Sequence, residues 1–195
     1  MVDRRVGWLV AALVAGVGAT GCCGNLLKKD KGDSSPPPLV TSNPNQPKVG
    51  ETGQTVRIAE AKAQFDAPAG WANYNDKGWL KFRAMDGQAM LGIVQYTKSG
   101  EATDRIEQIA DQFDLRNIKW DGGQTPGKVG EFNANKAGGT CKMRSGVDGK
   151  IYYATVDTGT PNKLLWVYLY NATGPNADKH LQHINKATST LRRLF

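Results

Sequence analysis

The chain has 195 residues, of which 39% are hydrophobic and 22% are charged, and this balance excludes a polytopic membrane protein. Three cysteines are too few to hold a disulfide-built miniprotein together, so a packed core must supply the stability. With 25 Lys and Arg against 18 Asp and Glu, the formal net charge of +7 permits an anionic partner without requiring one.

The N-terminus has the pattern of a secretory signal peptide. Two arginines precede an uncharged run over residues 6–21, which is shorter than the roughly 20 residues needed to span a bilayer. The run ends in the string ATGC at residues 19–22, and small residues before a cysteine resemble the bacterial lipobox. That resemblance implies cleavage before Cys22 and fatty acylation of Cys22, whose acyl chains contribute about 0.8 kcal/mol per buried CH₂. Cys23 is the poorer candidate because a cysteine precedes it, and a plain secreted protein or an uncleaved anchor is the alternative.

The residue after the lipidated cysteine bears on the membrane of destination. It is Cys23 rather than the Asp that retains lipoproteins in the inner membrane. We therefore expect the protein to be anchored in the outer membrane through acylated Cys22, on the periplasmic side. The alternative is the extracytoplasmic face of the cytoplasmic membrane.

Residues 22–49 have the composition of a flexible tether. Lysines, aspartates and the string SSPPP at residues 34–38 leave little apolar surface to offset the entropy of ordering. The prolines favour an extended, semi-rigid spacer of about 3.1 Å per residue. We therefore divide the chain into a signal peptide over 1–21, a lipidated and disordered tether over 22–49, and one folded domain over 50–195.

Hydrophobic periodicity within the domain predicts strands on both sides of one helix. The strands are expected at residues 56–59, 64–66, 79–84, 90–96, 117–120, 127–133, 139–144, 150–156 and 164–170. Apolar residues at i, i+3, i+4 and i+7 predict an amphipathic helix over 103–115. Asn176 is expected to cap a last helix that runs to the C-terminus, with a buried stripe reaching Leu194 and with Arg192 and Arg193 complementing its dipole. The fold class is α+β.

The segment before the third expected strand resembles a known family. Phe65, Pro68, Gly70 and Trp71 match an F-x-x-P-x-G-W pattern found in PsbP-like proteins, which include small bacterial lipoproteins and extrinsic subunits of photosystem II. The order of elements is also similar to that family over most of the domain. The resemblance implies an α/β/α sandwich, in which helices flank an antiparallel sheet. It implies no activity, because one fold hosts many functions.

Three patterns associated with chemistry are incomplete. Residues 122–128 have the spacing of a phosphate-binding GxxxxGK loop, but Val129 replaces the Ser or Thr that holds Mg²⁺, and a strand is expected to follow. His180 and His183 lack a third good ligand and are expected to be exposed on the last helix. No serine lies in a G-x-S-x-G elbow, and Cys141 is expected to be a buried or partly buried free thiol, with a disulfide to Cys23 as the alternative. We therefore expect no metal, no cofactor and no catalytic residue.

Aromatic residues on the strand expected at 164–170 have two interpretations. Trp166, Tyr168 and Tyr170 share one face of this strand because side chains alternate. If helices cover both faces of the sheet, these rings belong to the core, which we favour. If one face is open, they make a platform for a glycan or a peptide strand.

A second aromatic position gives the candidate binding surface. Trp120 precedes a glycine-rich loop over residues 121–127, and Lys128 follows it. Loops on a rigid scaffold commonly carry recognition residues. We therefore predict that Trp120 and Lys128 contribute to a binding surface.

These features predict a membrane-anchored envelope lipoprotein whose domain binds or scaffolds an unknown envelope protein or glycan without catalysis. The alternative is a small envelope hydrolase acting on a cell-wall or glycan substrate, which requires a nucleophile and a base that converge within about 3 Å. Nucleic acid is excluded as the expected partner, because only the positive charge favours it and export disfavours it.

Overall fold

The structure is a computed structural model that describes residues 53–195, so the predicted signal peptide, Cys22 and the tether lie outside the described residues. The strands are β1 (Thr55–Ile58), β2 (Ala63–Asp66), β3 (Ala72–Asp76), β4 (Trp79–Arg83), β5 (Ala89–Tyr96), β6 (Arg116–Trp120), β7 (Thr125–Val129), β8 (Phe132–Lys142), β9 (Asp148–Asp157), β10 (Lys163–Tyr170) and β11 (Arg192–Arg193). The helices are α1 (Ser99–Glu107), α2 (Ile109–Phe113) and α3 (Ala177–Ser189).

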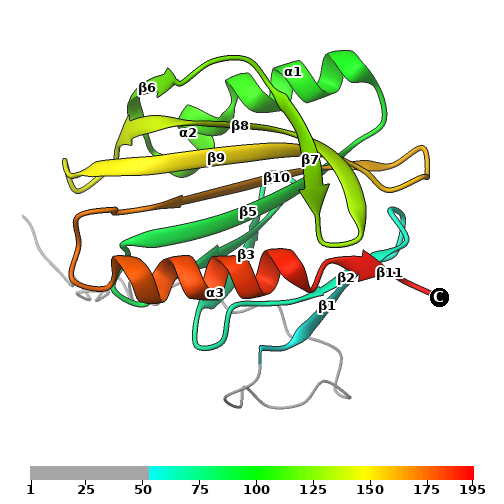
Figure 1. Cartoon of the computed structure of the whole chain (residues 1–195), viewed down its shortest axis with the longest axis horizontal. Coiled ribbons are helices and arrows are strands. Elements are labelled where there is room, and N and C mark those ends of the chain that lie inside the picture. The colour runs from blue at the N-terminus through cyan, green and yellow to red at the C-terminus, as the bar shows by residue number, and fades with distance from the viewer. Residues whose placement is uncertain (1–52) are drawn as a thin grey trace, which may run out of the picture. The chain divides into compact units, whose positions relative to one another are not determined.

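An antiparallel sheet of eight strands forms the centre of the domain. Its order is β3-β4-β5-β10-β9-β8-β6, and β7 also pairs with β8. A small sheet with the order β1-β2-β11 packs beside α3, and α1 and α2 lie on the opposite side of the large sheet from α3 (Figure 1). The predicted α+β class, with an antiparallel sheet flanked by helices, is confirmed.

Alternation along β10 divides the hydrophobic core into two layers. Leu165, Val167 and Leu169 are fully buried and face α1 and α2. Trp166 points to the other side, where it is 1% exposed and meets the edge of Phe65 with ring centroids 5.0 Å apart. Both faces of β10 are therefore covered at Trp166, as the favoured interpretation predicted.

The two tyrosines that follow Trp166 lie at the margin of that core. Tyr168 and Tyr170 are half-buried, and the Tyr168 ring stacks on Tyr152 at a centroid distance of 5.0 Å. Burial raises the pKa of Tyr168 to about 12, so its hydroxyl stays protonated at neutral pH. The aromatic stripe is thus core at Trp166 and a partly covered edge at the tyrosines.

The helix predicted over residues 103–115 is two helices in the structure. It begins earlier, at Ser99, because the Glu101 carboxylate accepts a hydrogen bond from the Thr97 N–H at 2.8 Å and closes the first turn. It ends at Phe113 because Asp114 adopts a left-handed conformation with φ of 53°. Among residues 53–195, none of the helices combines the length and the apolar character needed to cross a bilayer.

The prediction for the C-terminus is wrong in its last turn. The helix α3 stops at Ser189, and Arg192 and Arg193 form a short strand against β2 instead of complementing the helix dipole. The free edge of β2 offers backbone groups that need partners, and this pairing supplies them. Asn176 stands at the N-cap position, but its side chain makes no capping hydrogen bond. It donates instead to Asp86 Oδ2 at 3.0 Å.

One strand was not predicted, and another was predicted with the wrong bounds. The strand β3 was not predicted, because the sequence ANYND lies on an open edge and carries no apolar alternation. The strand predicted over 127–133 is the end of β7 and the start of β8, which are joined by a tight turn at Gly130 with φ of 56°. The missed strand matters because β3 forms one wall of the cavity described next.

Candidate functional site

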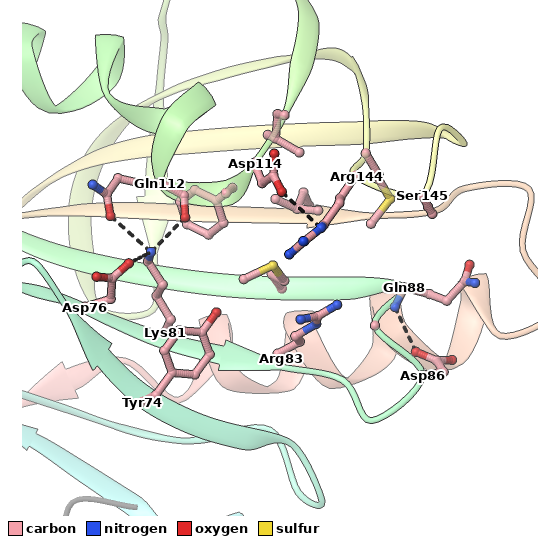
Figure 2. A pocket seen from close by; sticks show the side chains of 16 residues that line it. Tyr74, Asp76, Lys81, Arg83, Asp86, Gln88, Gln112, Asp114, Arg144 and Ser145 are labelled. Carbon is pink, nitrogen blue, oxygen red and sulfur yellow. Dashed lines mark hydrogen bonds and ion pairs between the residues drawn. The ribbon is translucent and has the colours of Figure 1, made fainter. Parts of the chain in front are cut away.

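An open cavity of about 390 Å³ lies at one end of the large sheet. Its walls come from β3 and β4, from the loop before β5, from the segment joining α2 to β6, and from the turn after β8 (Figure 2). This volume lies at the lower end of the range found for small-molecule sites. The cavity is therefore the candidate functional site that the described residues offer.

The register of the strands aims two cationic side chains toward this cavity. Lys81 and Arg83 lie two residues apart on β4, so they share one face of the sheet. Arg83 pairs with Met90 on β5, and Met90 pairs with Leu169 on β10. Arg83, Met90 and Leu169 thus form a row across the sheet beneath the cavity, with the charged residue at the outer end and the apolar residues further in.

Lys81 is almost fully buried and uses all of its hydrogen-bond donors. Its Nζ donates to Asp76 Oδ2 at 2.7 Å, to the Gln112 carbonyl at 2.7 Å and to Gln112 Oε1 at 3.0 Å. The rings of Tyr74 and Phe113 lie 5.9 Å and 5.6 Å from the same atom. The hydrogen bond from Lys81 lowers the pKa of Asp76, so this carboxyl is ionised at neutral pH. Lys81 thereby ties the β3–β4 hairpin to the C-terminal end of α2.

Two arginines face each other across the cavity. Figure 2 shows Arg83 on β4 and Arg144 in the turn after β8 pointing toward one another. Arg144 Nε lies 3.3 Å from Asp114 Oδ2, an ion pair in which both side chains are more than half exposed. Arg83 makes no ion pair and no side-chain hydrogen bond within residues 53–195. Among the described residues that line the cavity, its guanidinium is the cation without an ion-pair or hydrogen-bond partner.

Five apolar residues also line the cavity. Met90, Phe113, Leu115, Met143 and Leu169 line it, and each belongs to the core between the large sheet and α1 and α2. Methionine side chains adapt to irregular shapes because they are unbranched and polarisable. The cavity thus combines a rim of three cationic and three acidic side chains with an apolar and adaptable floor.

A second hollow of about 260 Å³ contains the two histidines. His180 was expected to be exposed, but it is 6% exposed, with Nε2 2.9 Å from Asp86 Oδ2 and its ring against Trp71. Burial acts to raise the pKa of Asp86, but hydrogen bonds from the Gln88 N–H, Asn176 and His180 outweigh it and lower the pKa overall. The expectation of exposure is therefore wrong for His180, because tertiary contacts with the β4–β5 turn bury it.

The neighbouring His183 is half-buried, and its Nδ1 has no hydrogen-bond partner among the described residues. Burial lowers the pKa of His183, and the nearby cations Lys179 and Lys186 act in the same direction. A search of residues 53–195 finds no group of three or more His, Cys, Asp or Glu side chains placed to hold a metal ion. We assign no metal or cofactor to this hollow.

The residues predicted as a binding surface are placed apart. Trp120 is half-buried, with its ring edge-on to Tyr153 at a centroid distance of 4.9 Å, whereas Lys128 is exposed on β7. Their partners on β8 are Gly139 and Asn133, which are six positions apart and hence about 20 Å apart along the strand. Neither residue lines the cavity. Trp120 and Lys128 therefore remain a prediction, and they do not form one compact patch.

Two further sequence interpretations can be placed. The glycine-rich GxxxxGK segment ends in β7 rather than at a helix N-terminus, so it lacks the amide groups that hold phosphate. Cys141 is buried and forms no disulfide within residues 53–195. Burial raises the pKa of Cys141 to about 11, with a smaller contribution from Asp148.

Sequence reasoning missed the cavity residues for an identifiable reason. Lys81 lies in the string WLKFR, where alternation places it on the same face as Trp79, and this was the one local signal of a buried cation. Its partner Gln112 is 31 residues away and in another element. Arg144 follows β8 in a turn, and nothing local links it to Arg83.

Comparisons with known proteins return similar solved structures and no sequence relatives. No protein-family model matches the chain, and none of the curated proteins matches it. A protein from Bacteroides thetaiotaomicron has a TM-score of 0.49 and 14% identity over 72% of this chain and 48% of its own. This chain thus spans about half the length of that protein.

Two further similar structures have printed names. The cyanobacterial PsbP protein (CyanoP) of Synechocystis has a TM-score of 0.48 and 12% identity over 73% of this chain and 93% of its own. LpqN, which is involved in cell envelope biogenesis of Mycobacterium tuberculosis, has a TM-score of 0.41 and 13% identity over 66% of this chain and 81% of its own. A PsbP protein is thus among the similar structures, and at these values the likeness carries no function to this chain.

Proposed function

We propose that the protein is a lipid-anchored envelope lipoprotein whose domain binds another envelope component without catalysing a reaction. The observation that carries the proposal is the lipobox-like string at residues 19–22, which is followed by a tether and then by a folded domain. Acylated Cys22 would hold the protein in the bilayer, in the outer membrane and on the periplasmic side. The partner is an envelope protein or a glycan, and not nucleic acid.

The chemistry of the cavity supports binding over catalysis. The ammonium of Lys81 is saturated by three acceptors, and Arg144 is paired with Asp114. The Cys141 thiol does not line the cavity, and with a pKa of about 11 it is almost entirely protonated at neutral pH and therefore a poor nucleophile. The arginines of the cavity can hold a ligand by charge, and none of these groups is activated for attack.

A small envelope hydrolase is the second candidate, and one observation favours it. Asp86 orients the His180 imidazole through a 2.9 Å contact, which is how a carboxylate positions a general base. Among the described residues that line this hollow, none is Ser, Thr or Cys. Turnover of p-nitrophenyl esters that is lost in His180→Asn, at an unchanged unfolding midpoint, would establish the hydrolase in place of the binding module.

The anchor is tested by substituting each cysteine at the junction. Cys22→Ser should abolish incorporation of labelled palmitate and release the protein from membranes, because it removes the acylated sulfur. Cys23→Ser is the matched control and should retain both labelling and membrane attachment. Retention of both properties in Cys22→Ser, or fractionation with the inner membrane, would contradict the proposed anchor and address.

The same preparations test whether the domain has a partner. Affinity capture from crosslinked envelopes should recover a defined component with the wild-type chain and lose it with Cys22→Ser, which is not held at the membrane. Lys128→Gln probes the predicted surface without disturbing packing, since Lys128 is exposed, whereas Trp120 packs on Tyr153. Unchanged capture by Lys128→Gln would remove Lys128 from the proposed surface.

A further inference from the structure

The arrangement of charge around the larger cavity leaves one cation without a partner. Three acidic residues line the cavity: Asp76 is paired with Lys81, Asp114 is paired with Arg144, and Asp86 accepts hydrogen bonds from the Gln88 N–H, Asn176 and His180. Arg83 has no such partner within residues 53–195. Its guanidinium therefore offers unsatisfied donors to whatever enters the cavity.

The position of Arg144 makes the site suited to a bridging anion. Arg83 and Arg144 point toward one another from opposite walls (Figure 2), so their like charges repel when the space between them holds only water. A carboxylate or phosphate between two guanidinium groups removes that repulsion and accepts two charge-assisted hydrogen bonds. The exposed pair with Asp114 is weak enough for Arg144 to share its donors with a ligand.

The floor beside these arginines accepts an apolar group. Met90 pairs in register with both Arg83 and Leu169, and Met143 lies just before Arg144 in the chain. A ligand whose anionic end lies between the arginines therefore meets apolar surface immediately below. The volume of about 390 Å³ suits a compact molecule rather than a polymer chain.

From this arrangement we propose that the cavity is a binding site for a small organic anion, in which a carboxylate or phosphate bridges Arg83 and Arg144 and a compact apolar body rests on Met90 and Met143. The proposal rests on the proposed function in one respect, because it names the ligand class of the binding module. It does not depend on acylation of Cys22, so the two can fail separately.

The test uses the full chain in phosphatidylcholine nanodiscs, with protein-free nanodiscs as the blank. Isothermal titration calorimetry at low ionic strength compares phenyl phosphate and benzoate with three reference compounds. Benzyl alcohol lacks the charge, benzylammonium reverses it, and inorganic phosphate lacks the apolar body. We expect both organic anions to bind and the three reference compounds to bind at least about tenfold more weakly, because each lacks one of the two recognition elements.

Two variants with opposite expected effects sharpen the test. Arg83→Gln should weaken binding of phenyl phosphate by about tenfold or more, because it removes the uncommitted guanidinium. Asp114→Asn should strengthen binding severalfold, since it removes the carboxylate that competes for Arg144, and asparagine tolerates the left-handed backbone at this position. Arg57→Gln, at an exposed position on β1, is the matched control and should leave binding unchanged.

The outcomes separate this inference from the anchor. Binding of the organic anions with the expected ranking of variants supports it. Absence of binding in a chain that incorporates palmitate at Cys22 would overturn the ligand assignment and leave the anchor standing. Equal binding of benzyl alcohol, or unchanged affinity in Arg83→Gln, would overturn the bridging role of the arginines. Inorganic phosphate binding as tightly as phenyl phosphate would overturn the apolar part of the site.

Discussion

Lys81 gives the sharpest test of how this domain is held together, because its ammonium is buried among three acceptors. Lys81→Met keeps the aliphatic part of the side chain and removes only the charge and its hydrogen bonds. The partner Asp76 has a side chain that is 44% exposed, so water can solvate its carboxylate after the substitution, whereas the Lys81 side chain is 2% exposed. Removing Lys81 therefore leaves a carboxylate that water can solvate, whereas removing the charge of Asp76 leaves an ammonium that water cannot reach.

The expected magnitudes follow from that asymmetry. Lys81→Met leaves the Gln112 carbonyl and Oε1 without their donor, at about 1 to 3 kcal/mol for buried groups left unsatisfied, and it relieves the desolvation of the ammonium. We expect a net loss of about 1 to 3 kcal/mol in the free energy of unfolding. Asp76→Asn leaves a buried ammonium without its counter-charge; breaking a buried pair costs about 3 to 5 kcal/mol, and the exposure of Asp76 places this pair near the lower end, at about 3 kcal/mol. Asp76→Asn should therefore be the more destabilising of the two.

The pH dependence has a definite sign. The pKa of Asp76 is lowered in the folded state, chiefly by the hydrogen bond from Lys81, so its contribution is fully present above the unfolded value near 3.8. That contribution is lost as the pH falls through the lower, folded pKa. The difference in stability between wild type and Asp76→Asn should stay constant from about pH 5 to pH 7 and narrow below about pH 4.

The assay is urea unfolding of the full chain, followed by tryptophan fluorescence. Trp79 lies edge-on to Phe113 at 5.5 Å and reports on the contact between the sheet and α2. The double variant Asp76→Asn/Lys81→Met completes a cycle that should give a coupling free energy of about 1 kcal/mol or more. A coupling near zero, or Lys81→Met that costs more than Asp76→Asn, would refute the asymmetry argument.

Two further predictions concern packing. Gly92→Ala should cost about 1 to 3 kcal/mol in the free energy of unfolding, because its Cβ would overlap Cζ of Phe113. Gly100→Ala in α1 meets open space and should stabilise by about 0.5 kcal/mol, and urea unfolding that ranks the two variants otherwise would contradict this packing. In the Cys22→Ser/Cys23→Ser background, Cys141 should react with Ellman's reagent at pH 8 in urea but not in the native state, because burial raises its pKa to about 11. Rapid native labelling would show that the Cys141 thiol is accessible.

The parts of the fold that depend on local periodicity were predicted from the sequence. Alternation in the string LLWVYLY correctly assigned Leu165 and Trp166 to opposite faces, because side chains alternate along any strand. The spacing of apolar residues at i, i+3 and i+4 predicted α1 and α2 as one continuous helix. It missed the break at Gln108, where the helix divides. The strand β3 escaped because a polar edge strand carries no alternation to detect.

The sequence by itself determined which central segments are helices or strands, which residues of β10 share a face, and the lipobox-like string at residues 19–22. Each of these features depends only on residues that are close together in the chain. Only the tertiary structure decided that Lys81 is buried, that His180 meets Asp86 and that Arg83 faces Arg144. In each case the partners are distant in the chain, and their meeting depends on strand order and on how α2 and α3 dock. The physical reason is that a local pattern fixes which way a side chain points, whereas its charge environment is set by whatever the fold places opposite it.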